Sequence, residues 1–247
     1  MYHFFVEPNA ISGKTVTITG KDVNHIKNVL RMKKGEEISV SHTDSSADYH
    51  CLIETLSDEC VTAEVIFVKE EGNELPAKIY LFQGLPKQDK MELIIQKCVE
   101  LGVFEIIPVN MKRSIMKIDE KKVKSKTERW QAISEAAAKQ SKRTVIPQIK
   151  EPVSFKNAIT MAGECNIKLL PYEMATAEGM EKTRALFDSV KPGDSVAVFI
   201  GPEGGFDDSE INLSKEAGFE IITLGKRILR TETAGLVVLS NLMMRLE

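Results

Sequence analysis

The sequence has no long apolar run and no basic leader. No stretch approaches the roughly 18 apolar residues that a membrane-spanning helix needs. The first ten residues, MYHFFVEPNA, lack the basic start and apolar core of a secretory signal peptide. We therefore expect a cytoplasmic protein. Its 247 residues, 43% hydrophobic and 28% charged, suffice for one large globular domain or two modest ones.

Cysteine and histidine are scarce. The four cysteines form no C-x-x-C pair, which argues against a zinc site or a redox motif and favours free thiols. The four histidines all fall within the first fifty residues. Chemistry placed further along the chain would proceed without histidine, so we expect neither Ser/His/Asp catalysis nor a bound metal.

Positive charge is unevenly distributed, although the net charge is only −3. Residues 112–143 carry eleven Lys or Arg against four Asp or Glu, and residues 21–34 carry five against one. Segregation of this kind favours a basic face that binds a polyanion such as nucleic acid. A lysine-rich helix with a solvated face is the alternative for either cluster.

Residues 2–68 have the pattern of a small β domain. Short stretches of strand-forming residues, separated by glycines or Asp/Ser clusters, predict strands over 2–6, 15–18, 37–42, 49–56 and 60–68. One helix is predicted over 22–32. The polar stretch 69–76 predicts a linker. We therefore place a β-barrel domain at residues 1–70.

From residue 77 the pattern predicts alternating strands and helices. Strands are expected over 78–85, 104–110, 145–149, 167–172, 195–201 and 219–225. Helices are expected over 89–101, 120–141, 155–161, 179–190, 209–217 and 231–245. Repeated β-α units predict a mostly parallel sheet with helices on both faces. We therefore predict an α/β domain over residues 77–247.

The last predicted helix has almost no polar face. A helix that is apolar all round has to be buried on every side. A dimer interface is one way to bury it, and packing inside its own domain is another. The sequence leaves both open.

A glycine-rich loop, IGPEGGF at residues 200–206, follows an apolar strand and precedes Asp207, a predicted helix N-cap. Its glycines do not match the G-x-G-x-x-G spacing of a dinucleotide loop. A phosphate loop would need Lys and Ser or Thr where Gly205 and Phe206 stand, and Glu203 would repel phosphates. These features favour a nucleoside that carries no phosphate and tolerates a carboxylate.

Two further loops, at residues 170–173 and 224–234, follow neighbouring predicted strands. The carboxyl ends of parallel strands meet at one edge of a sheet, so we expect the three loops to form one crevice. S-adenosylmethionine fits such a crevice. Backbone amides and apolar side chains can hold its adenosine, and its sulfonium tolerates nearby carboxylates.

Five segments in order carry a family resemblance. They are NHIKNVLRMKKGE, IIQKCVELGV, RW...ISEAAAKQSKR, IGPEGGF and LGKRILRTETA. Together they resemble the ribosomal RNA small subunit methyltransferase E family, which belongs to the SPOUT class of knotted methyltransferases. The similarity covers nearly the whole chain. Lys142 is a small departure, because many members of the family have glycine there.

The resemblance implies a PUA-like N-terminal β-barrel that binds RNA and a C-terminal SPOUT α/β domain with a deep trefoil knot. It implies a homodimer through the knotted domain and the last helix. It also implies S-adenosylmethionine as cofactor and N3-methylation of a uridine in the decoding region of 16S rRNA, within the small ribosomal subunit. Topology rules alone would exclude a knot.

The resemblance also maps the three loops onto a cofactor pocket. The predicted cofactor-binding residues are Leu170, Pro171, Tyr172, Glu173, Ile200, Gly201, Pro202, Glu203, Gly204, Leu224, Gly225, Ile228 and Leu229. Tight turns that need a positive φ would explain the glycines without any ligand.

For catalysis, we predict that Arg230 stabilises charge on the uracil oxygens, with Glu232 as a base or as the partner of Arg230. The alternative is that Thr231 caps the last helix while Arg230 and Glu232 form an ordinary ion pair. A solvated surface is likewise the alternative for each predicted RNA contact. Those contacts are Arg31, Arg113, Lys139, Gln140, Ser141 and Arg143.

Two rival functions stay open at this stage. A non-enzymatic RNA-binding protein could use the barrel and the basic helix and keep an inactive nucleoside pocket. A nucleotide-dependent enzyme of another type could use the same crevice. Stabilisation by S-adenosylhomocysteine, ATP or NAD would discriminate between them.

Overall fold

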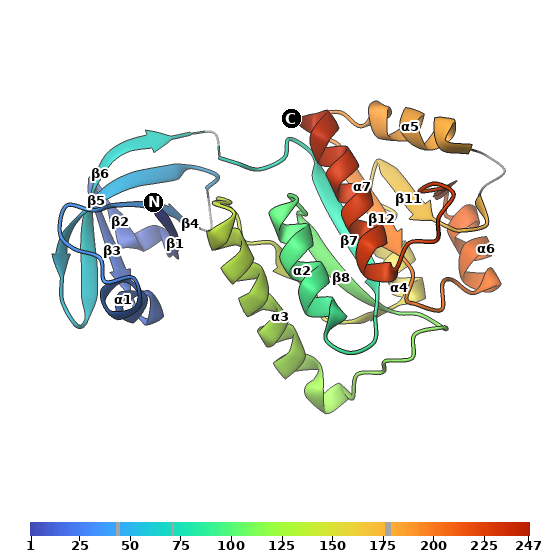
Figure 1. The fold of residues 1–247 in the computed structure, drawn as a ribbon, viewed down its shortest axis with the longest axis horizontal. Coiled ribbons are helices and arrows are strands. Elements are labelled where there is room, and N and C mark those ends of the chain that lie inside the picture. Colours follow the sequence, from blue (N-terminus) through green and yellow to red (C-terminus); the bar gives the residue numbers. More distant parts are fainter. Residues whose placement is uncertain (43–44, 71, 176–178) are drawn as a thin grey trace. The chain divides into compact units, whose positions relative to one another are not determined.

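The computed structural model describes residues 1–42, 45–70, 72–175 and 179–247 (Figure 1). The chain divides into two compact units. Unit 1 comprises Met1–Glu74 and Ala138–Ile146, and unit 2 comprises Leu75–Ala137 and Pro147–Glu247. The first boundary falls in the predicted linker. The segment Ala138–Ile146 differs from the expectation of one continuous second domain, because it groups with unit 1.

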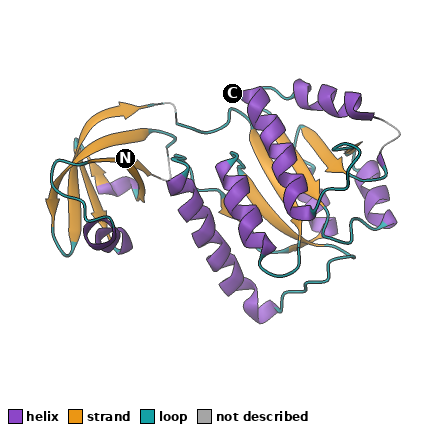
Figure 2. Cartoon of the chain, in the orientation of Figure 1, coloured by secondary structure: helices purple, strands orange, loops and turns teal. Residues whose placement is uncertain are grey.

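Unit 1 is built on a six-stranded sheet in the order β1-β4-β5-β6-β3-β2. Figure 2 draws the strands of the chain in orange. β1 pairs with β4 in parallel, and the remaining pairs are antiparallel. Alternate side chains, such as Phe4, Ile38 and Ile53, form its buried core. The strands are β1 (Tyr2–Val6), β2 (Ile11–Ser12), β3 (Thr15–Thr19), β4 (Glu37–His42), β5 (Asp48–Leu56) and β6 (Cys60–Lys69), with a 3-10 turn, η1 (Pro8–Ala10), before β2.

A helix interrupts the strands of unit 1 where one is predicted, but it is not a regular α-helix. α1 (Lys21–Asn24) continues as a π-helical turn, η2 (His25–Val29). Arg31 then takes a φ of 54°, a left-handed conformation that is uncommon for residues other than glycine. π-helical turns of this kind are frequent at functional sites.

Unit 2 is built on a parallel sheet in the order β10-β8-β7-β12-β11-β13, with β9 also paired to β8. Its described pairings are parallel, as the alternating pattern predicts. The strands are β7 (Lys78–Gly84), β8 (Glu105–Asn110), β9 (Gln148–Ile149), β10 (Val153–Ser154), β11 (Ile167–Pro171), β12 (Ser195–Ile200) and β13 (Glu220–Ile222). The helices are α2 (Lys90–Glu100), α3 (Glu120–Gln140), α4 (Phe155–Ala162), α5 (Gly179–Ser189), α6 (Asp208–Glu216) and α7 (Thr231–Leu246).

Helices cover both faces of this sheet (Figure 1). α2 and α7 pack against each other, and α7 lies against β7 and β12. On the other face, α4 and α6 contribute Phe155 and Ile211 to an aromatic core. There Phe82 of β7 stacks on Phe199 of β12, with ring centroids 4.4 Å apart. The central strands are thus buried on both faces, which explains their continuous apolar sequence.

Two helix ends fall where the sequence predicts them. The Asp207 side chain accepts the N–H of Ser209, and Glu210 accepts the N–H of Asp207, so α6 begins with a capping box. Hydrogen bonds from the Ser209 hydroxyl and backbone lower the pKa of Asp207 to about 2. At the other end of a helix, Gly102 follows α2 with a φ of 87°.

The last helix, α7, buries one face within its own unit. Val238, Leu239 and Leu242 are fully buried, whereas Met244 is 71% exposed. Leu93, on the neighbouring helix α2, is also exposed. Packing inside the unit therefore accounts for one side of this apolar helix only. Among the helices of the described residues, none has both the length and the apolarity to cross a membrane.

Candidate active site

The three predicted loops meet in unit 2 because β12, β11 and β13 are neighbours in the sheet. Two adjoining cavities lie at the carboxyl ends of these strands and share Pro171, Glu173, Ile228, Leu229 and Ala234. The larger holds about 1100 Å³ of empty space, part of it open to solvent. That is room for a ligand of nucleoside size or larger. The crevice predicted from the strand order is therefore present.

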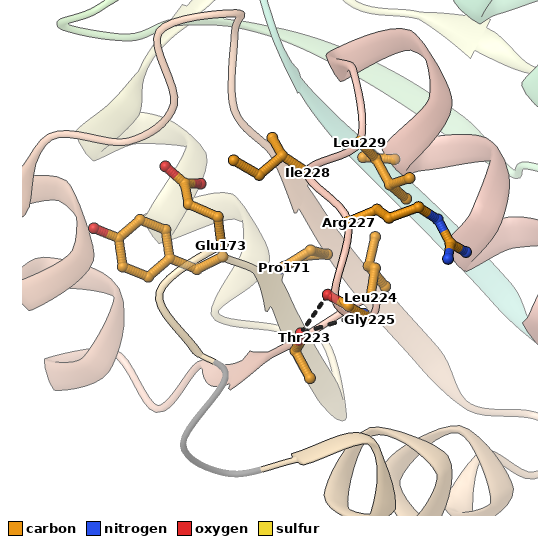
Figure 3. A pocket seen from close by; sticks show the side chains of 10 residues that line it. Pro171, Glu173, Thr223, Leu224, Gly225, Arg227, Ile228 and Leu229 are labelled. Carbon is orange, nitrogen blue, oxygen red and sulfur yellow. Dashed lines mark hydrogen bonds between the residues drawn. The ribbon is translucent and has the colours of Figure 1, made fainter.

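The larger cavity is walled by the glycine-rich loop and by the start of α7. Its lining includes Ile200, Gly201, Pro202, Glu203, Gly204, Arg230 and Thr231. The smaller cavity is lined by the loop after β13 and by Tyr172 (Figure 3). In that view the Arg227 side chain points away from Glu173. The predicted cofactor residues thus line the two cavities, except Leu170, which is fully buried in the core.

The glycines of the loop have structural reasons of their own. A Cβ on Gly204 would lie 3.0 Å from Cβ of Arg113, and one on Gly201 would lie 3.2 Å from the ring of Phe206. Gly205 has a φ of 67°, which favours glycine directly. Close packing and turn geometry therefore explain these glycines without a ligand. Their part in binding one stays a prediction.

A chain of hydrogen bonds ties the glycine loop to the last helix. Gln83 of β7 donates from Nε2 to Thr231 Oγ1 over 2.9 Å, and Thr231 Oγ1 donates to the carbonyl of Gly201 over 2.6 Å. Both side chains are buried. The alternative in which Thr231 caps α7 is wrong, because Arg230 holds the N-cap position and makes no side-chain cap bond. Thr231 instead fixes the cavity wall.

Lys90, at the start of α2, lies between two carboxylates of the larger cavity. Its Nζ is 3.1 Å from Glu203 Oε1 and 3.2 Å from Glu232 Oε2. The Glu203 carboxylate also accepts the backbone N–H of Lys87. The contacts of Lys90 Nζ with Glu203, the larger cause, and with Glu232 raise the pKa of Lys90. Burial alone would raise the pKa of Glu203, but hydrogen bonds from its own backbone, Lys90 and Lys87 outweigh it and hold the pKa lower.

Sequence reasoning missed Lys90, Gln83 and Thr231 as parts of this site. Lys90 and Gln83 precede the glycine loop by more than a hundred residues, and no motif around them signals a pocket. Thr231 stands between two predicted catalytic residues, and this position is the signal in the sequence that could have indicated its part in the site. The Arg230 side chain is 82% exposed and lies 4.0 Å from Glu232, so the ion pair of the alternative is present as a long contact open to solvent.

The predicted RNA contacts of unit 1 fall into two groups. Arg31 and Gln140 are exposed. Lys139 pairs with Asp22, with Nζ 3.0 Å from both carboxylate oxygens, and the Ser141 hydroxyl donates to the carbonyl of Ala138. Arg143 is 3% exposed. The structure thus gives Lys139 and Arg143 intramolecular partners, which weakens their prediction as RNA contacts.

The partner of Arg143 is Glu74. The Arg143 guanidinium donates to both oxygens of this carboxylate, which also accepts the backbone N–H groups of Thr144 and Val145. These bonds hold the segment Ala138–Ile146 to the end of the unit 1 chain. In unit 2, the last predicted contact, Arg113, is exposed and donates to the carbonyl of Gly204. Arg113 therefore lies beside the cavity.

Two family models match the chain. The model of the RNA methyltransferase domain matches residues 73–243, and that of the RNA methyltransferase PUA domain matches residues 18–66. The two matches fall largely within unit 2 and unit 1 respectively.

Two curated relatives of nearly equal length are similar to this chain along almost its whole length. The ribosomal RNA small subunit methyltransferase E of Bacillus subtilis is 37% identical over 244 residues, which cover 97% of this chain and 95% of the relative. The protein of the same name from Mesomycoplasma hyopneumoniae is 36% identical and covers 98% of each chain.

Solved structures are similar to this chain over nearly its whole length. A Neisseria gonorrhoeae ribosomal RNA small subunit methyltransferase E, bound to S-adenosyl methionine, matches with a TM-score of 0.81 and 31% identity over 97% of this chain and 95% of that one. A Legionella pneumophila protein, solved in complex with SAM, matches with a TM-score of 0.83 and 32% identity over 98% and 97%.

Proposed function

Because this chain belongs to the ribosomal RNA small subunit methyltransferase E family, we propose that it transfers the methyl group of S-adenosylmethionine to N3 of a uridine in the decoding region of 16S rRNA. The observation that carries the proposal is the cavity at three neighbouring strand ends. It lies in the unit that matches the RNA methyltransferase domain.

The residues of the cavity fit S-adenosylmethionine. Apolar side chains, among them Pro171, Ile228 and Leu229, suit the adenosine. Three carboxylates, Glu173, Glu203 and Glu232, lie in or beside the cavity, and negative charge favours a ligand that carries a sulfonium. A phosphate ligand would be repelled by the same groups.

When bound, the cofactor supplies an electrophilic methyl carbon whose bond to sulfur breaks as the bond to uracil N3 forms. The chain has to remove the N3 proton and to stabilise the negative charge that then spreads over the uracil oxygens. The exposed guanidinium of Arg230 is suited to the second task. The carboxylate of Glu232, held by Lys90, is suited to accepting the proton.

We also propose a homodimer that uses the outer faces of α2 and α7. These neighbouring helices expose Leu93 and Met244, and apolar side chains of this kind favour an interface. We extend the proposal to three further features: the trefoil knot, the cytoplasmic location and action on the assembled small subunit. For these three features the proposal rests on the family alone.

Methylation of small subunits in vitro tests the function directly. The purified protein is incubated with S-adenosylmethionine and either small ribosomal subunits or free 16S rRNA, and the RNA is digested to nucleosides for mass spectrometry. We expect N3-methyluridine in the assembled small subunits; its formation in free 16S rRNA alone would overturn the choice of substrate. A different methylated nucleoside would overturn the N3 assignment. Cofactor-independent RNA binding without any methylation would favour the rival, a non-enzymatic RNA-binding protein.

A further inference from the structure

A row of four residues crosses the sheet of unit 1 on the face opposite its apolar core. The strand register places His3 of β1 opposite Ser39 of β4, Ser39 opposite His50 of β5, and His50 opposite Phe67 of β6. Directly opposed residues share one face of a sheet. The neighbours of this row along the strands, such as Phe4, Ile38 and Cys51, belong to the core on the other face.

The row ends in an exposed aromatic ring. Phe67 is 54% exposed, and its ring stacks on the imidazole of His50 with centroids 4.1 Å apart and planes 15° apart. His50 thus covers one side of the ring. A stack of this geometry leaves the opposite side of Phe67 as a flat apolar surface.

Buried polar groups hold the backing imidazole in place. The Nε2 of His50 is 3.4 Å from Oδ2 of Asp48, whose other oxygen is 3.8 Å from Nδ1 of His3. The Nδ1 of His3 is also hydrogen-bonded to Oγ of Ser39 over 2.6 Å. His3, Ser39 and Asp48 are all buried. The surface presented by Phe67 is therefore rigid, so that little conformational entropy is lost when a flat ligand stacks on it.

Positive charge accompanies the ring on this side. Lys69 lies two residues beyond Phe67 on β6, hence on the same face. Its Nζ donates to the neutral amide of Asn73, a contact that leaves its charge in place. Lys142 is exposed, and its backbone carbonyl accepts a hydrogen bond from Nδ2 of the same Asn73 over 2.9 Å, which places it close to Lys69. Lysine side chains of this kind suit phosphates.

We propose that Phe67, backed by His50, is a stacking platform for an unpaired base of the bound RNA, with Lys69 and Lys142 contacting the adjacent phosphates. The RNA partner rests on the proposed function, whereas the site rests on the ring stack and its charges. Unpaired bases are commonly recognised by stacking on aromatic side chains. The exposed neighbour Val68 alternates to the other face of β6. Ile66 is the extra residue of a β-bulge, where the register passes from His50–Phe67 to Cys51–Val65. One aliphatic side chain beside the ring does not make an apolar protein interface.

The test measures binding of a fluorescent single-stranded RNA dodecamer to the full chain by anisotropy at fixed salt. Removing a stacked base costs enough that Phe67→Ala should bind at least about fivefold more weakly. Phe67→Trp keeps a ring and should bind as well as the wild type. Ile66→Ala is the matched control, because it removes exposed apolar surface from the same strand without a ring, and should leave affinity unchanged.

Salt dependence separates the ring from the lysines. Phe67→Ala should keep the slope of log affinity against log salt, whereas Lys69→Gln or Lys142→Gln should reduce it by about 0.7, the value for one phosphate contact on a single strand. Equal affinity of Phe67→Ala and wild type overturns the platform, and so does a changed oligomeric state of Phe67→Ala in sedimentation, which would make this face a protein interface. Absence of RNA binding by the wild type overturns it too. Calorimetry with S-adenosylhomocysteine tests the cofactor pocket independently, since unit 2 alone forms it.

Discussion

Glu232 pairs with Lys90 in preference to its sequence neighbour Arg230. Lys90 Nζ lies 3.2 Å from the Glu232 carboxylate, whereas the nearest nitrogen of Arg230 is 4.0 Å away. Lys90 therefore balances negative charge in the cavity wall, and the Arg230 side chain stays largely in solvent. A role of Arg230 toward a substrate stays a prediction.

Lys90→Met should increase the preference of the cavity for S-adenosylmethionine over S-adenosylhomocysteine by about threefold or more. The loss of one positive charge leaves Glu203 and Glu232 without their shared partner, which favours the cationic sulfonium over the neutral thioether. Calorimetry with both ligands at pH 7 measures the ratio. Lys90→Arg keeps the charge and serves as the control. An equal loss of affinity for both ligands would limit Lys90 to shaping the cavity.

Arg230→Ala should lower kcat by about 100-fold, the magnitude typical for loss of one group that stabilises transition-state charge. Its side chain is 82% exposed, so the fold and the affinity for S-adenosylmethionine should hardly change. Steady-state kinetics with saturating cofactor measure this split. Lys226→Ala, in the same loop, is the matched control. Turnover at the wild-type rate would show that Arg230 is a surface residue without a part in catalysis.

Arg143→Ala should lower the free energy of unfolding by about 2–4 kcal/mol, because the carboxylate of Glu74 loses its charged partner in a largely buried site. Urea denaturation measures the change, and Gln140→Ala, an exposed neighbour, should leave stability as it is. If Arg143 is instead an RNA contact, as its sequence context predicts, the expected result is the opposite. That role requires unchanged stability together with weaker, less salt-dependent RNA binding.

His3 should make the protein less stable in mild acid. Burial lowers the pKa of His3 from 6.5 to about 4, so between these two values the unfolded chain binds a proton that the folded chain does not. The free energy of unfolding therefore falls as the pH drops from about 6.5 to 4, by up to about 3 kcal/mol. Denaturation curves across this range measure the effect. His3→Gln, which does not titrate, should flatten the dependence; an unchanged slope would place its source elsewhere.

Met244→Glu combined with Leu93→Glu should give a monomer, because both charges would be buried at the proposed interface of α2 and α7. Sedimentation velocity at micromolar concentration measures the oligomeric state. Ile115→Glu, which alters an exposed apolar residue elsewhere in unit 2, should keep the parent state. If the unsubstituted protein is itself monomeric at this concentration, the proposed interface is wrong.

Local patterns predict the elements of this fold well. The parallel sheet follows from alternating apolar strands and amphipathic helices, and the meeting of three loops follows from the rule that carboxyl ends of parallel strands share one edge. The cap at Asp207 and the turn at Gly102 are equally local, because neighbouring backbone groups determine them. These features need no knowledge of distant residues.

The misses at Arg143 and Lys90 depend on distant partners. Arg143 has the composition of a phosphate contact, and only the position of Glu74, 69 residues earlier, gives it a structural role. Lys90 acquires its place from Glu203, more than a hundred residues later. The π-helical turn at His25–Val29 is a different case, because the sequence pattern predicts a helix over 22–32 and does not distinguish α from π geometry. Lys142, where the family pattern has glycine, takes a φ of 57°, which explains why glycine suits that position.

The bond chain Gln83–Thr231–Gly201 joins positions that are 148 and 30 residues apart in the sequence, and it has a consequence for the order of folding. Thr231 can reach both partners only when α7 lies against β7 and β12. A chain whose parallel sheet has formed but whose α7 has not yet docked therefore has no fixed cavity wall. We expect the pocket to become able to hold a ligand only at this late step, so that ligand binding reports the completed packing of unit 2.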